Sequence, residues 1–214
     1  ASSGLALLAE GRVQEALDRL EQVVRLRPDS ASAANNLAAA YRVQGDMARA
    51  VEWCRRALAI DAAFAPAHSN LLACLNYLPD TSLAEILAEH RRFGARLEAP
   101  LRPHWRGHDN SRDPDRRLRI GYRSGDFRAH AMAFSIAPVL ARHAPGSFEA
   151  ICYANNARED DVTTRLRRSA HAWHRVVGMS DDDMAALVRS HGIDILVDLS
   201  GHTALNRLPV FARK

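Results

Sequence analysis

The chain's 214 residues, 47% of them hydrophobic, are enough for one large domain or two small ones, and no run of about 18 apolar residues is present that could cross a membrane. The formal charge of +4 does not indicate a nucleic-acid-binding surface, because the 25 acidic residues are interspersed with the 29 basic ones and nearly all of the latter are arginine, as a GC-rich genome would produce. Three cysteines lie singly in apolar or helical contexts, which predicts buried free thiols in a reducing compartment and therefore a cytoplasmic protein.

The segment 1–78 repeats with a period of 34 residues. This period, with a small residue where two helices cross, is the signature of tetratricopeptide repeats. We therefore predict a helical repeat solenoid here. Five pairs of identical residues show the spacing: Gly11 and Gly45, Ala16 and Ala50, Ala33 and Ala67, Asn36 and Asn70, and Leu37 and Leu71.

One repeat, Ala31 to Ile60, is nearly complete, whereas the first lacks its early residues and the third loses the pattern at Leu78-Pro79. Stacked repeats bury their faces against neighbours, and about three are needed for stability. We therefore expect this segment to be the end of a longer array, with further repeats before Ala1.

The segment 79–117 is predicted to be a helix followed by a linker. Apolar residues recur at helical spacing from Thr81 to Leu97. The stretch 99–117 is rich in proline and charge, which is typical of a linker or a surface loop.

The segment 118–214 alternates between short apolar runs and helical patterns. Strands joined by single helices run parallel, with right-handed crossovers. The predicted fold class is therefore an α-helical tetratricopeptide solenoid followed by an α/β Rossmann-like lobe, which we expect to be incomplete because doubly wound domains usually have more than four strands. The strands are expected at 118–123, 148–154, 172–177 and 193–201, and the helices at 131–144, 159–170 and 181–192.

The loops after the first and fourth strands carry the candidate site residues, because ligands of an open parallel sheet bind outside the carboxyl ends of the strands. The first loop holds Asp126 and His130, and the second holds Asp198, His202 and Thr203. Two alternatives stay open: Asp126 could simply cap the next helix, and His130 could be a structural histidine. Asp198 is more informative, because a carboxylate beside an apolar run needs a partner.

Other kinds of site find little support in the sequence. GYRSGDF is not the dinucleotide fingerprint, and neither a phosphate-binding P-loop nor a GxSxG nucleophile motif is present. His104 and His108 lie in the proline-rich linker without cysteine or acidic residues at ligand spacing, so no metal site is expected.

Asn36 and Asn70 occupy equivalent positions on the first helix of successive repeats, the helix that lines the concave face of such arrays. A side-chain amide there can donate to a peptide carbonyl and accept from a peptide N–H, whatever the peptide's side chains. A stabilising hydrogen bond between repeats explains the pattern equally well.

With both regions in view, the chain resembles the bacterial relatives of the protein O-linked N-acetylglucosaminyltransferases, glycosyltransferase family 41. The resemblance covers nearly the whole chain. It implies a repeat superhelix joined to a GT-B catalytic region of two Rossmann-like lobes, of which the second, binding most of the uridine diphosphate, would be absent here. Its carriers are APAHSNLLACLNYLPD, DPDRRLRIGYRSGDFRAH, FEAICYA and HGIDILVDLSGHTALNRLPVFARK.

The resemblance implies inverting transfer of N-acetylglucosamine from UDP-N-acetylglucosamine to serine or threonine hydroxyls of proteins, with no cofactor and no required metal. His130 matches the family's proposed proton acceptor, a role that suits a neutral imidazole. Asp198, His202 and Thr203 would lie near donor sugar or acceptor, although animal members have tyrosine where this chain has His202. The asparagine ladder that binds acceptor peptide in the family corresponds to Asn36 and Asn70.

Two alternatives to this function remain. The chain could belong to a non-enzymatic tetratricopeptide scaffold whose α/β part is a structural remnant. It could also belong to a GT-B glycosyltransferase that uses a different acceptor or sugar.

Overall fold

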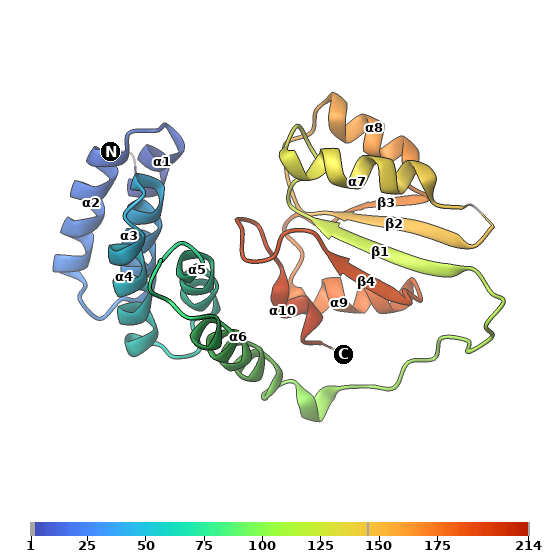
Figure 1. Cartoon of the computed structure of the whole chain (residues 1–214), viewed down its shortest axis with the longest axis horizontal. Helices are drawn as coiled ribbons and strands as arrows, with labels where there is room; N and C mark the ends of the chain where they lie inside the picture. The colour runs from blue at the N-terminus through green and yellow to red at the C-terminus, as the bar shows by residue number, and fades with distance from the viewer. Residues whose placement is uncertain (1–2, 145, 214) are drawn as a thin grey trace. The chain divides into compact units, whose positions relative to one another are not determined.

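The computed structural model describes residues 3–144 and 146–213. The chain divides into two compact units, Ala1–Pro100 and Leu101–Lys214, which are considered separately (Figure 1). Within the described ranges, no helix is long and apolar enough to span a bilayer.

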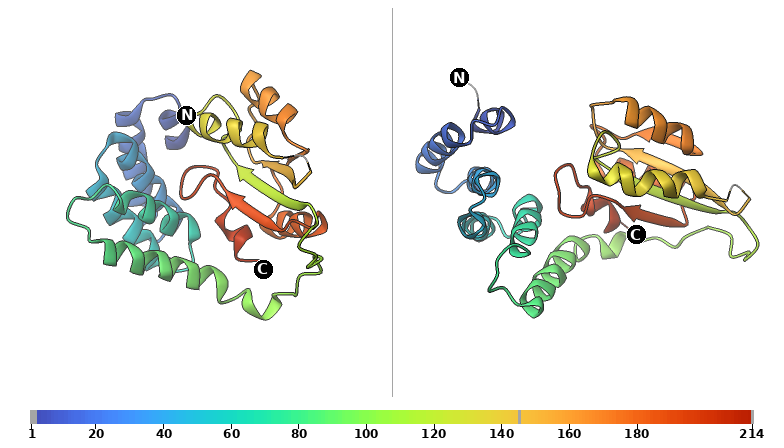
Figure 2. Two further views of the ribbon diagram at one scale, coloured as in Figure 1. Left: turned by 45° about the vertical axis from the view of Figure 1, so that its right-hand side comes forward. Right: turned by 45° about the horizontal axis from the view of Figure 1, so that its top comes forward.

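All regular elements of the first unit within residues 3–100 are helices. Consecutive helices pack side by side, as Figures 1 and 2 show, so the predicted helical solenoid is confirmed. The nearly complete repeat predicted at 31–60 is a hairpin of two helices of 14 residues each. The helices are α1 (Gly4–Ala9), α2 (Val13–Leu26), α3 (Ala31–Gln44), α4 (Met47–Ile60), α5 (Ala65–Leu75) and α6 (Leu83–Glu98).

The 34-residue period has two physical causes in this unit. Ala16 and Ala50 are completely buried, as expected where two helices approach too closely for a larger side chain. Gly11 and Gly45 have φ angles of 78° and 93°, in the left-handed region that glycine adopts without steric penalty. Successive repeats therefore have a small residue at the helix crossing and a glycine with positive φ at the turn.

The second unit is a parallel α/β lobe, as predicted. Its sheet has the strand order β3-β2-β1-β4, and every neighbouring pair is parallel. Within the described residues β4 lies at a sheet edge, which explains why this apolar strand is only partly buried. The elements are η1 (Arg102–His104), β1 (Leu118–Ser124), α7 (Ala131–Arg142), β2 (Phe148–Ala154), α8 (Asp161–Ser169), β3 (Ala172–Arg175), α9 (Asp181–Ser190), β4 (Ile195–Asp198) and α10 (Leu208–Phe211).

Two apolar layers cover the two faces of this sheet, with α7 and α8 on one face and α9 and α10 on the other (Figures 1 and 2). Neighbouring residues of β2 point to opposite faces, so Cys152 joins the layer under α7 and α8 while Tyr153 packs against Met184 and Val210. Burial raises the pKa of the Cys152 thiol to about 12. The three cysteines are free and buried, as predicted.

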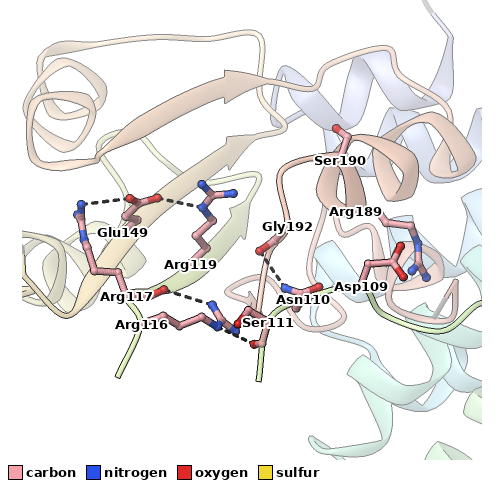
Figure 3. A pocket seen from close by; sticks show the side chains of 10 residues that line it. All are labelled: Asp109, Asn110, Ser111, Arg116, Arg117, Arg119, Glu149, Arg189, Ser190 and Gly192. Carbon is pink, nitrogen blue, oxygen red and sulfur yellow. Dashed lines mark hydrogen bonds and ion pairs between the residues drawn. The ribbon is translucent and has the colours of Figure 1, made fainter. Parts of the chain in front are cut away.

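Polar contacts tie the segment before β1 to the amino edge of the sheet. Asn110 Nδ2 donates to the carbonyl of Gly192 at 3.0 Å (Figure 3). Arg116 donates to both carboxylate oxygens of the partly buried Asp194 at 2.6 Å, and the backbone N–H of Arg119 donates to the same group at 2.8 Å. The Arg116 guanidinium, followed by these other donors, holds the pKa of Asp194 well below its usual range.

This pairing predicts a pH-dependent stability. A carboxylate whose pKa is lowered by folding stabilises the folded state above its unfolded pKa of about 3.9, and the stabilisation is lost as pH falls through the folded pKa. We expect Asp194→Asn to lower the free energy of unfolding by about 1–3 kcal/mol at neutral pH, with the gap from wild type shrinking below about pH 4. Denaturant unfolding of both proteins across this range measures the gap, and a gap of constant size would contradict the assignment.

Candidate active site

Two loops meet at the carboxyl edge of the sheet. The β1–α7 loop (residues 125–130) and the β4–α10 loop (residues 199–207) follow adjacent parallel strands, so both leave at the same edge (Figure 1). The backbone N–H of Gly125 donates to Ser200 Oγ at 3.3 Å. Leu205 lies so close to Gly125 that a Cβ added to this glycine would be 2.7 Å from the leucine Cβ. The structure therefore brings together the two loops that the strand-end rule selected.

His130 is the N-cap residue of α7, and its Nδ1 accepts from the backbone N–H of Met132 at 3.3 Å. The alternative in which Asp126 caps this helix is therefore wrong. Asp126, in the same loop, is instead buried, accepts from Arg128 at 3.1 Å and lies 4.0 Å from His130 Nδ1. The His130 side chain is 43% exposed, so solvent or a substrate can reach it.

His130 Nδ1 thus has two competing neighbours, a backbone donor and a carboxylate acceptor. While Nδ1 accepts from Met132, a neutral ring carries its proton on Nε2 and can only donate there. If the Nδ1–H form turns to Asp126, the lone pair on Nε2 becomes free to accept a proton. The Met132 contact is long for a hydrogen bond, so giving it up costs on the order of 1 kcal/mol.

The start of α8 fixes the position of the β1–α7 loop. One carboxylate oxygen of Asp160 accepts from the Ala129 N–H at 2.7 Å, and the other caps α8 by accepting from the Thr163 N–H at 2.9 Å. Thr163 Oγ1 also donates to the carbonyl of Phe127 at 2.7 Å. Neither Asp160 nor Thr163 was predicted to matter for the site, although the Asp-x-x-Thr spacing at the start of a helix was a visible capping signal.

Asp198 has the partner that its place beside an apolar run requires. Its Oδ1 accepts from Arg123 Nη1 at 3.3 Å, and its Oδ2 accepts from the Gly201 N–H at 2.6 Å. The carboxylate therefore holds the start of the β4–α10 loop, and a contact with substrate remains a prediction. In the same loop His202 is half-buried, and the exposed Thr203 donates its hydroxyl to the Ser200 carbonyl at 2.7 Å.

The asparagines of the first unit form one hydrogen bond between repeats. Asn70 Nδ2, on α5, donates to Asn35 Oδ1, on α3, at 2.8 Å. The partner is thus Asn35 and not the equivalent residue Asn36, which is half-buried beside it. The structural alternative accounts for one donor of Asn70, and peptide binding by Asn36 and Asn70 remains a prediction.

Two pockets of the second unit lie toward opposite edges of the sheet. The pocket in Figure 3, about 470 Å³ at the amino edge, contains Arg117 and Arg119, but Glu149 pairs with both at 3.2 and 3.1 Å. A mostly apolar groove of about 650 Å³ runs between α7 and α8, with His130 and the highly exposed Phe134 in its lining. The second pocket therefore extends from the candidate histidine, whereas the first lies at the opposite edge. The described residues include no group of three metal-ligating side chains.

Comparison with known families gives two matching segments. Residues 2–66 match the model of a tetratricopeptide repeat, and residues 75–214, well over half of the chain, match that of glycosyl transferase family 41. The chain belongs to glycosyl transferase family 41. The resemblance expected from the sequence is thereby confirmed.

Individual relatives agree with this membership. The chain is 31% identical over 159 residues to the "Probable UDP-N-acetylglucosamine--peptide N-acetylglucosaminyltransferase SPINDLY" of Petunia hybrida, covering 72% of this chain and 17% of that protein. The protein of the same name from Arabidopsis thaliana is 33% identical over 150 residues, covering 68% of this chain and 16% of its own length. The chain therefore spans less than a fifth of these curated relatives.

A solved structure covers almost all of the chain. It is a mutant of the O-GlcNAc transferase of Thermobaculum terrenum, which matches with a TM-score of 0.89 at 34% sequence identity. The match covers 98% of this chain and 40% of that one. The match to this O-GlcNAc transferase structure thus includes both the helical repeats and the parallel α/β lobe.

Proposed function

We propose that the full-length protein transfers N-acetylglucosamine from UDP-N-acetylglucosamine to serine or threonine hydroxyls of proteins, with inversion at the anomeric carbon. The observation that carries the proposal is the meeting of the β1–α7 and β4–α10 loops, with a reachable histidine, at the ligand-binding edge of a family 41 lobe. The names of the curated relatives, peptide N-acetylglucosaminyltransferases, support the choice of sugar and acceptor.

In this proposal His130 accepts the proton of the attacking hydroxyl. The hydroxyl oxygen forms a bond to the anomeric carbon as the bond from that carbon to the diphosphate breaks on the opposite face, so one displacement inverts the centre. The hydroxyl proton passes to His130 Nε2, and Asp126 stabilises the ring form with hydrogen on Nδ1. The reaction as written requires no metal ion, so a chelator should leave its rate unchanged.

The repeats supply the acceptor-binding part of the proposal. Of the two predicted ladder residues, Asn36 is the better candidate for binding peptide backbone, because the side-chain amide of Asn70 already donates to Asn35. We expect Asn36→Ala to raise KM for a long acceptor peptide several-fold without changing the Tm. Asn35→Ala is the matched control and should lower the Tm by a few degrees, since it breaks the bond between repeats. Equal effects of the two substitutions on KM would contradict a ladder role for Asn36.

The experiment that tests the function uses labelled UDP-N-acetylglucosamine and serine- or threonine-containing peptides with the full-length protein. We expect labelled peptide in which NMR shows the β-anomer. Absence of UDP binding in calorimetry would overturn the proposal in favour of the non-enzymatic scaffold. UDP binding without peptide labelling would overturn the assigned acceptor or sugar, and a screen of donors and acceptors would then identify the actual pair.

A further inference from the structure

Arg123 is a completely buried charged residue at the carboxyl end of β1. Burying a guanidinium costs several kcal/mol unless charge and hydrogen bonding compensate it. Here the compensation is partial: Nη1 donates to Asp198, Nη2 donates to the carbonyl of Leu205, and Nε is buried without a partner among the described residues. A group this costly at the ligand edge of the sheet calls for an explanation beyond packing.

The two acceptors of Arg123 lie at opposite ends of one loop. Asp198 ends β4, and Leu205 lies near the far end of the β4–α10 loop, so a single guanidinium joins the two ends. Asn155, which follows β2, donates its Nδ2 to the same Leu205 carbonyl at 3.0 Å. The side chains of Arg123, on β1, and of Asn155, just after β2, thus both donate to one backbone oxygen of the loop.

The backbone of Leu205 has a conformation that leucine disfavours. Its φ of 60° lies in the left-handed region, and among the described residues it is the one non-glycine residue there. Leucine is disfavoured in this region by clash of its Cβ, and such a conformation persists only where surrounding contacts over-determine it. The hydrogen bonds from Arg123 and Asn155 to the Leu205 carbonyl are those contacts. Because Leu205 also lies close to Gly125, its position affects that of the β1–α7 loop.

We infer that Arg123 is a positioning residue for sugar transfer, which together with Asn155 fixes the β4–α10 loop through the Leu205 carbonyl and so places His202 and Thr203 for substrate binding. Arg123 itself touches neither substrate nor reacting atoms in this account. The role of Arg123 in sugar transfer rests on the proposed function, whereas its role in fixing the conformation of the β4–α10 loop does not.

The test compares Arg123→Met, Asn155→Ala and the control Arg119→Met in the full-length protein. Arg119 is also on β1 and also paired with a carboxylate, but at the amino edge. We expect hydrogen exchange of residues 199–207 to accelerate about tenfold or more in the first two variants and to stay at the wild-type rate in the third. We also expect KM for donor or peptide to rise more than kcat falls, with Arg123→Lys intermediate.

A merely structural role for Arg123 would lower the fraction of folded enzyme, reducing kcat while leaving KM unchanged. The inference is overturned if both variants show wild-type exchange in the loop, or if KM is unchanged. If Arg123→Met fails to fold, Asn155→Ala decides alone, because it removes a neutral donor to the same carbonyl. Should wild-type protein transfer no sugar, the proposed function fails while the exchange measurement still decides the loop contact.

Discussion

Replacing His130 with asparagine in the full-length protein should lower kcat for sugar transfer by about 10²–10⁴-fold while leaving stability unchanged. The rate effect is the usual contribution of a positioned general base. Stability should survive because asparagine is among the best N-cap residues and can still accept the Met132 N–H that His130 accepts now. Steady-state rates at saturating UDP-N-acetylglucosamine and peptide, together with a melting curve, measure both quantities.

Two further variants separate proton transfer from simpler effects. His130→Ala should lose both the rate and about 1 kcal/mol of stability, because alanine cannot cap α7. Phe134→Ala is the matched control, since this exposed residue lies in the same groove lining but cannot move a proton. Near-wild-type kcat in His130→Asn would show that the histidine only caps its helix.

Replacing Asp198 with alanine should destabilise the lobe by about 3–5 kcal/mol. The substitution leaves the buried guanidinium of Arg123 without its charge partner, which is the costly way to disrupt a buried ion pair. It also removes the acceptor of the Gly201 N–H. Hydrogen exchange of the β1 amides in the full-length protein reports the local loss of stability.

The double variant Arg123→Met/Asp198→Asn is the informative control for Asp198. It removes both charges while keeping an acceptor near Gly201, so most of the lost stability should return. If Asp198→Ala instead kept wild-type stability and lost substrate affinity, the carboxylate would be a binding residue, as the family resemblance implies, and its structural role would be minor.

Much of the fold was predictable because it follows from local sequence patterns. The 34-residue spacing of Ala16 and Ala50 arises from close packing within each hairpin, so it is visible in any stretch of repeat. The parallel lobe followed from apolar runs separated by helical patterns. The predicted strand at 148–154 has the observed limits of β2, whereas the expected strand at 193–201 shortens to Ile195–Asp198 because the chain after Asp198 turns into the site loop.

The site was predictable only to the level of loops. The strand-end rule selected the segments of His130 and His202 because the carboxyl ends of parallel strands all lie at the same edge of a sheet. The roles of Arg123, Asn155 and Asp160 could not be predicted, because each depends on a partner between 31 and 82 residues away in the sequence. Arg123 was additionally obscured by its residue type, since an arginine in a chain rich in arginine gives no sign that it is buried.

In the proposed function, sugar transfer takes place where the β1–α7 and β4–α10 loops meet. Hydrogen exchange of the full-length protein, with and without UDP-N-acetylglucosamine and an acceptor peptide, tests this most directly. The claim predicts slower exchange in residues 125–130 and 199–207, and no change in residues 109–119 at the amino edge. Transfer that proceeds with both loops unprotected, or with protection confined to the amino edge, would contradict it.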